Sequence, residues 1–211
     1  MAKLTDMDVL LFRAGSTAWD EAGRIGGSCD LPPSESGLAS VRERVSSLIA
    51  SLGSPVGGVL CGPDEASQES GEVVAQAAGA KVRVVESLGE VKLGLWEGML
   101  RKDALEKFPT SYGQWRENPA SVNVPEGESL HEAADRVLTG LAKSLEKLKM
   151  EPGEVVAVVL RPLAFGIVRS WVHGKDLSEL WTTIESCPCS ERVSVTRARV
   201  KQMKEGLGAS A

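Results

Sequence analysis

The stretch of sequence that decides the fold runs from residue 10 to residue 20 and reads LLFRAGSTAWD. Its apolar part extends back to Val9, directly after Asp8, and an unbroken apolar run of this length predicts a buried β-strand. Arg13 follows the strand at once and leads into a short loop of Ala14, Gly15 and Ser16. Because ligands of open α/β sheets lie outside the carboxyl ends of the strands, Arg13 is a candidate ligand-binding residue.

Further segments accompany this stretch in a fixed order, among them GRIGG at residues 23–27, LGEVKLGLWEG at residues 88–98 and PEGES at residues 125–129. Together they resemble the motifs of the phosphoglycerate-mutase-like histidine phosphatase superfamily. In that family a first strand ends in Arg-His-Gly, and the later segments read Leu-x-Glu-x-x-x-Gly-x-Trp-Glu-Gly and Pro-x-Gly-Glu-Ser. The resemblance covers residues 7–195 and implies a three-layer α/β/α sandwich around a mostly parallel sheet.

The pattern of apolar residues independently predicts alternating strands and helices, which is typical of a mostly parallel sheet with helices on both faces. The expected strands span residues 8–12, 56–61, 82–85, 155–160 and 192–200. The expected helices span residues 38–52, 66–78 and 130–148, and a further one starts at Pro162. Ser129 and Glu132 have the spacing of a capping box at the start of the third helix. The unbroken apolar run at residues 155–160 predicts a central strand that is covered on both faces.

The resemblance implies a reaction in which an imidazole attacks phosphorus and carries the phosphoryl group, while arginines and a second histidine neutralise the oxygens. In this chain the position of the nucleophilic histidine falls on Ala14, and that of the second histidine falls on Arg161. A methyl group has no lone pair with which to attack phosphorus. By analogy with nucleophile removal in another hydrolase, we expect a loss of about a millionfold in turnover, which is about 8 kcal/mol of barrier.

Two more positions of the implied phosphate pocket also differ. The arginine that clamps the phosphate falls on Ala66, and the asparagine of the family's Trp-Asn pair is replaced by Asp20. A carboxylate at that place repels a phosphate dianion and has no proton to donate at neutral pH. Arg13 is retained, and Glu90 matches the family's proton-donating acid, although Glu90 alone cannot catalyse phosphoryl transfer.

The surviving charged residues allow two arrangements, between which the sequence does not choose. In the first, Arg13 and Arg161 form a weakened anion site. In the second, these arginines pair internally with Asp20 and Glu90 and close the pocket. The leading hypothesis is a catalytically inactive pseudophosphatase, without a cofactor or a metal, that acts as an anion-binding or protein-interaction module for phosphate or another small anion.

A different hypothesis retains an enzyme. Cys61 lies at the end of the second strand, where a nearby arginine would lower the pKa of its thiol, and it would then serve as a substitute nucleophile of a weak or altered phosphomonoesterase. Its simpler interpretation is a small residue in place of a family serine. The two histidines offer no other nucleophile, because His131 is expected in the first turn of a helix and His173 at a helix end.

Composition indicates one domain over residues 1–211, with an ordered core at about residues 7–200 and a tail at residues 201–211. The net charge of −5 argues against nucleic acid or an anionic membrane as a partner. We interpret the basic run at residues 197–204 as a solvated last strand and tail. The first residues carry no signal peptide, so we expect a cytoplasmic protein.

The remaining cysteines and the tryptophans receive structural interpretations. The four cysteines are not spaced as zinc ligands, and Cys187 and Cys189 alone form an incomplete metal site, to which we assign no function. We expect large aromatic residues to pack in the core or at its rim and not to stack on a ligand. These residues are Trp96, Trp115, Trp171 and Trp181.

Overall fold

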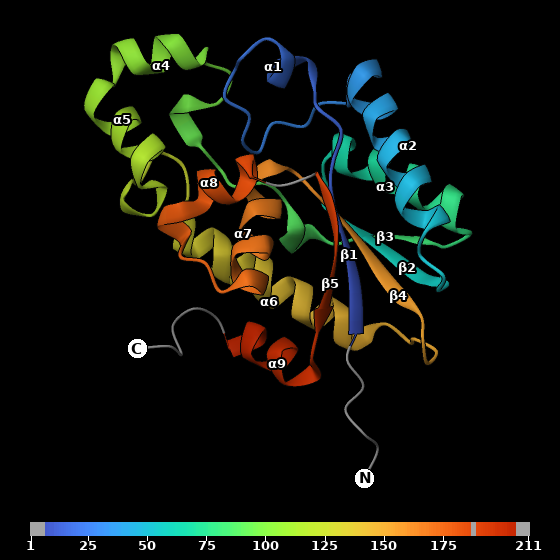
Figure 1. The fold of residues 1–211 in the computed structure, drawn as a ribbon. Coiled ribbons are helices and arrows are strands. Elements are labelled where there is room, and N and C mark those ends of the chain that lie inside the picture. The colour runs from blue at the N-terminus through green and yellow to red at the C-terminus, as the bar shows by residue number, and fades with distance from the viewer. Residues whose placement is uncertain (1–6, 187–188, 206–211) are drawn as a thin grey trace.

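The computed structural model describes residues 7–186 and 189–205, and its fold is drawn in Figure 1. Within this part of the chain a five-stranded sheet has the strand order β3-β2-β4-β1-β5. Its strands are β1 (Met7–Arg13), β2 (Val56–Cys61), β3 (Val82–Val84), β4 (Val155–Leu160) and β5 (Ser190–Val195). All neighbours are parallel except β5, which is antiparallel to β1. The predicted mostly parallel sheet is confirmed.

Strand β4 is the centre of the sheet and is buried along its whole length. Val156 and Val158 face one hydrophobic core, whereas Ala157 and Val159 face the other. A strand that contacts helices on both faces needs apolar side chains at every position, which explains the unbroken apolar run in the sequence.

Helices cover both faces of the sheet and produce the expected three layers (Figure 1). On one face, α2 (Glu35–Ala50) and α3 (Glu65–Ala78) bury small and branched residues such as Val41 and Val74. On the other face lie α6 (Leu130–Lys147), α7 (Pro162–His173) and α9 (Arg197–Glu205). Figure 1 shows the remaining short helices gathered mainly around the end of β1 that is opposite the N-terminus.

These short helices lie in the connections between the longer elements. They are α1 (Ala18–Glu21), η1 (Glu86–Leu88), η2 (Gly94–Trp96), α4 (Arg101–Lys107), α5 (Pro109–Glu117), η3 (Pro119–Ser121), η4 (Leu177–Glu179) and α8 (Leu180–Glu185).

Local sequence signals fix several boundaries. The capping box of Ser129 and Glu132 is formed at the start of α6, as predicted. Helix α3 begins one residue earlier than expected because Asp64 accepts a hydrogen bond from the N–H of Ser67 and caps it. It ends at Gly79, whose φ of 65° lies in the left-handed region that glycine adopts without strain.

The last predicted element is wrong in part. We expected one strand over residues 192–200, but β5 ends at Val195 and α9 follows, running five residues into the expected tail. Val193 and Val195 alternate as a strand requires, whereas Val200 and Met203 are three residues apart and both enter the core as one face of a helix. Arg199 is not simply solvated, because its guanidinium donates to the carbonyls of Trp171 and Val172.

Among the described residues, no helix has both the length and the apolar composition that crossing a bilayer requires.

Candidate functional site

Backbone hydrogen bonds from both neighbouring strands fix the end of β1. The N–H of Ala14 donates to the carbonyl of Leu160 and the N–H of Arg13 donates to the carbonyl of Cys189, each with an N···O distance of 2.8 Å. The guanidinium of Arg44 donates to the carbonyls of Arg13 and Cys189 at 3.0 and 2.7 Å. The strand end that carries Arg13 is therefore held at the carboxyl edge of the sheet.

The loop after β1 packs closely against the first turn of α2. The N–H of Gly15 donates to the hydroxyl of Ser70 at 2.9 Å, and the carbonyl of Ser16 accepts from the N–H of Ser34 at 2.7 Å. A Cβ atom on Gly37 would lie 2.4 Å from the Ser16 carbonyl oxygen. Only a glycine at residue 37 lets α2 approach the loop this closely. The position of the loop relative to α2 therefore depends on Gly37.

A cavity of about 280 Å³ opens beyond this edge of the sheet. Arg13, Ala14, Asp20, Glu90 and Arg161, five of the six positions singled out in the sequence, line it together. Its lining contains both arginines and carboxyl groups, together with apolar and aromatic side chains. The other charged lining residues are Arg101, Arg116 and Glu185, and the larger apolar and aromatic ones are Ile25, Leu93, Tyr112, Trp115, Trp181 and Ile184.

Arg161 and Asp20 form an ion pair inside the cavity, with Nη2 and Oδ2 3.2 Å apart and side chains 6% and 22% exposed. The same Oδ2 accepts from the N–H and the hydroxyl of Thr17, both at 2.8 Å. Burial raises the pKa of the Asp20 carboxyl, but Arg161 and the Thr17 donors outweigh burial and hold it below its ordinary value. Asp20 therefore stays ionised and partly neutralises Arg161.

Glu90 is held by backbone donors at the start of α7. Its Oε2 accepts from the N–H of Leu163 at 2.8 Å, and its Oε1 accepts from the N–H groups of Ala164 and Val91 at 2.8 and 2.9 Å. The N-cap residue, Arg161, makes no side-chain capping bond. The Glu90 carboxyl group thus satisfies the first N–H groups of α7 in place of a capping residue.

Burial dominates the titration of Glu90. It raises the pKa of the carboxyl to about 7, against the opposing effects of Arg161 and the three N–H donors. No ion pair joins Glu90 to an arginine among the described side chains, and none joins Arg13 to a carboxylate. Of the pairs expected in the closed arrangement, only Arg161 with Asp20 is formed, and Glu90 is bound by backbone instead.

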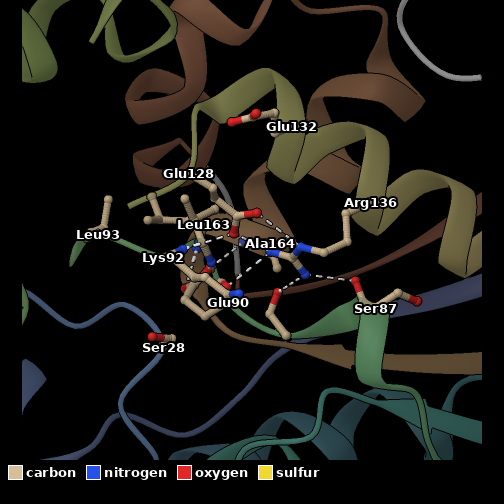
Figure 2. A network of polar contacts seen from close by, with 12 residues as sticks. Ser28, Ser87, Glu90, Lys92, Leu93, Glu128, Glu132, Arg136, Leu163 and Ala164 are labelled. Carbon is tan, nitrogen blue, oxygen red and sulfur yellow. Dashed lines mark hydrogen bonds and ion pairs between the residues drawn. The ribbon is translucent and has the colours of Figure 1, made fainter. Parts of the chain in front are cut away.

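Arg136 anchors the loop that carries Glu90 and was not singled out from the sequence. From α6 its guanidinium donates to the carbonyls of Ser87, Gly89 and Glu90 at 2.9, 2.9 and 3.2 Å. It also pairs with Glu128 at 2.5 Å, as Figure 2 shows. The segment at residues 125–129, recognised as a motif, therefore serves to position Glu90 through Arg136.

A second cavity of about 340 Å³ borders the other side of the Glu90 loop and is lined by Asp30, Asp64, Glu86 and Lys92 among others. Despite these acidic residues, the part of the chain that the structure describes contains no group of three or more His, Cys, Asp or Glu side chains arranged to hold a metal ion.

The sequence of this chain matches the model of a known protein family over most of its length. The model of the histidine phosphatase superfamily, branch 1, matches residues 9–204. The chain belongs to the histidine phosphatase superfamily.

Several members of the superfamily resemble the chain over most of its length. It is 26% identical to phosphoserine phosphatase 1 of Hydrogenobacter thermophilus over 174 residues, which cover 82% of this chain and 80% of that protein. It is 29% identical over 175 residues to a protein of Serratia proteamaculans named probable phosphoglycerate mutase GpmB, with 80% and 75% covered. The structure of a mycobacterial glucosyl-3-phosphoglycerate phosphatase shares the fold, with a TM-score of 0.70 at 20% identity over 83% of this chain and 84% of that one.

Two positions that the superfamily resemblance singled out lie outside the cavity. Ala66 is fully buried in the first turn of α3. Cys61 is fully buried in the hydrophobic core beneath α2 and α3. Burial raises the pKa of the Cys61 thiol to about 12, with Asp64 and Glu72 adding to the shift. A thiol that is neither ionised nor in the cavity is a poor nucleophile, so the structure argues against the Cys61 hypothesis.

The histidines and the other cysteines lie where the sequence interpretation put them, as far as they are described. His131 is exposed in the first turn of α6. His173 is in the last turn of α7, where its Nε2 lies 3.2 Å from a carboxylate oxygen of Glu191. Neither lines the cavity. Cys187 falls outside the described residues, and Cys189 contributes its carbonyl to the end of β1.

The tryptophans pack as predicted, but two of them also border the cavity, which we did not expect. Trp96 and Trp115 are buried, and their rings meet edge to face at 6.2 Å between centroids. Trp115 meets Trp181 in the same way at 5.8 Å. Trp115 and Trp181 form part of the apolar cavity wall. The spacing of single aromatic residues gives no sign of such a wall, because α5 and α8 meet only in three dimensions.

Proposed function

We propose that this member of the histidine phosphatase superfamily does not catalyse phosphoryl transfer and instead binds a small anion at the carboxyl edge of its sheet. The observation that carries the proposal is the side chain at the end of β1. Ala14 stands where the resemblance places the nucleophilic histidine, and neither His131 nor His173 borders the cavity. The described cavity therefore offers no imidazole to accept a phosphoryl group.

The charges around Ala14 support the same proposal. Asp20 places an ionised carboxylate in the cavity where a phosphate dianion would bind. The negative charges of the carboxylate and the phosphate repel each other, and they do so more strongly in a partly buried site than in water. Arg161 is engaged by that carboxylate, and Ala66 supplies no cation. A transition state with growing negative charge on its oxygens is thus poorly stabilised.

Glu90 supports the proposal through its hydrogen bonds. A general acid must hold a proton and deliver it to the leaving group. Both oxygens of Glu90 accept from backbone N–H groups, so the carboxyl group is held against the start of α7. We infer that Glu90 serves to stabilise the start of this helix.

Arg13 supports anion binding. It lines the cavity, and no described carboxylate pairs with it. A guanidinium at the end of a buried strand is suited to bind a carboxylate or a phosphate through two parallel hydrogen bonds. That the protein also binds a protein partner, and that it is located in the cytoplasm, are predictions from the sequence.

The test is turnover of an aryl phosphate by the purified chain from acidic to neutral pH, with an Arg13→Ala variant prepared identically. We expect both proteins to show the same background rate, which then comes from contaminating enzymes. Activity that Arg13→Ala abolishes would show that the cavity still does chemistry, and the non-catalytic function would be rejected.

A further inference from the structure

The charges that line the cavity suit an anion with a single negative charge. Four arginines and three carboxyl groups line the cavity, and two of these carboxylates are paired with arginines. Arg161 is paired with Asp20 at 3.2 Å and Arg116 with Glu185 at 3.1 Å. Among the described carboxylates, none pairs with Arg13. A monoanion places a single negative charge on Arg13, whereas the second charge of a dianion is repelled by the ionised carboxylate of Asp20.

Part of the cavity lining is aromatic, and its rings are packed against each other. Trp115 is 3% exposed, and its ring packs edge to face against Trp181 at 83°. The guanidinium carbon of Arg116 lies 4.6 Å from the centre of the Trp181 ring and holds that ring in place. A flat apolar group in the cavity gains about 25 cal/mol for each Å² removed from water, together with edge-to-face contacts.

The cavity also offers a neutral donor beside the wall. The hydroxyl of Tyr112 has no hydrogen-bond partner among the described residues, although its ring is buried against Trp96 at 5.6 Å between centroids. A volume of about 280 Å³ lies just below the roughly 300–1,000 Å³ that small-molecule sites span. It accommodates a ligand of about one ring and one acidic group.

Resting on the anion-binding function proposed above, we propose that the cavity takes a small aromatic monocarboxylate and not a phosphate ester. The two carboxylate oxygens bind the guanidinium of Arg13, and the ring lies against Trp115 and Trp181. Nothing is transferred or cleaved, because a carboxylate has no group that the site can displace.

The experiment is isothermal titration of the purified chain with four probes: benzoate, acetate, phenyl phosphate and inorganic phosphate. We expect benzoate to bind at least about tenfold more tightly than each of the other three. Arg13→Gln should weaken benzoate binding at least about tenfold, since a neutral amide replaces the charge–charge contact. The matched control is Arg42→Gln, which changes an exposed arginine on α2 and should leave benzoate binding unchanged.

The outcomes separate this inference from the function on which it rests. Phenyl phosphate binding as tightly as benzoate, or more tightly, overturns the carboxylate assignment and leaves the anion-binding function standing. Equal binding of acetate and benzoate overturns the role of the aromatic wall. If none of the four probes binds, both the inference and the anion-binding function are rejected. Turnover of phenyl phosphate that depends on Arg13 rejects the non-catalytic function, whatever the order of affinities.

Discussion

Asp20 sets how much positive charge the cavity presents to a ligand. Its carboxylate pairs with Arg161 and accepts two hydrogen bonds from Thr17. An anion that enters the cavity must therefore compete with this carboxylate for Arg161. The resemblance identified this replacement of asparagine by aspartate from the sequence. The sequence left open whether Asp20 pairs with an arginine at all, because residues 20 and 161 come together only through the pairing of β1 with β4.

Asp20→Asn should tighten the binding of inorganic phosphate by about tenfold, which is about 1.4 kcal/mol, because a like charge leaves the cavity and Arg161 becomes available. The amide oxygen can still accept from Thr17, so we expect α1 to stay capped. Titration calorimetry measures the change. Glu43→Gln, which alters an exposed carboxylate on α2, is the control for net charge. An unchanged or weaker affinity in Asp20→Asn would contradict the role assigned to Asp20.

Glu90 gives the unfolding free energy a dependence on pH. Its folded pKa of about 7 lies above the ordinary value of 4.5, so between these values the folded state holds a proton that the unfolded state has lost. The resulting stabilisation is complete below about pH 4.5 and is lost as the pH rises through about 7. A shift of this size corresponds to about 3 kcal/mol at most.

Glu90→Gln should remove this dependence, because the amide imitates the protonated acid and does not titrate. Urea unfolding of both proteins across this pH range measures the difference. We expect the native chain to lose stability relative to Glu90→Gln as the pH rises from about 4.5 to about 7. A difference that stays constant with pH would mean that Glu90 is ionised throughout.

Among the elements, those with a strong internal period were predictable and those defined by long-range contacts were not. The strand at residues 56–61 and the capped start of α6 agree with the prediction residue by residue. The end of the chain does not, since the alternation of Val193 and Val195 stops before Val200, which has helical spacing to Met203. The anchor from Arg136 to the Glu90 loop has no local signal, because its bonds join residues that are far apart in sequence.

Helix α9 provides a test at this scale. Met203 is 1% exposed and packs in the main core, whereas its neighbour Gln202 is exposed. Met203→Ala should lower the free energy of unfolding by about 2–4 kcal/mol, and Gln202→Ala should change it by less than about 0.5 kcal/mol. Thermal and urea unfolding measure both. Equal small effects would show that this segment does not pack on the core as a helix.

For the molecule as a whole, the fold and the neighbourhood of the site followed from the sequence, but the present chemistry of the site did not. Arg13, Asp20, Glu90 and Arg161 were expected near one another and line one cavity. The wall of Trp115 and Trp181 was missed, since it depends on how two short helices meet. The fold alone therefore does not decide which chemistry the cavity performs.

Rebuilding the reaction should require several changes at once. We expect Ala14→His alone to stay at background turnover of an aryl phosphate, because Asp20 and Arg161 still face the nucleophile. The triple variant Ala14→His, Asp20→Asn, Arg161→His should show measurable turnover, as it removes both members of the ion pair together. The triple variant with Arg13→Ala added is the control. Substantial turnover in Ala14→His alone would show that the rest of the site remained competent.

The central position of β4 has a consequence for how the chain matures during synthesis. Strands β1 and β2 do not touch each other, and both pair with β4, which begins at Val155. At synthesis rates of about 5–20 residues per second, β4 is synthesised on the order of 10 s after the apolar β1. Throughout that interval the nascent chain carries an unpaired hydrophobic strand, so we expect chaperones to raise the yield of folded protein.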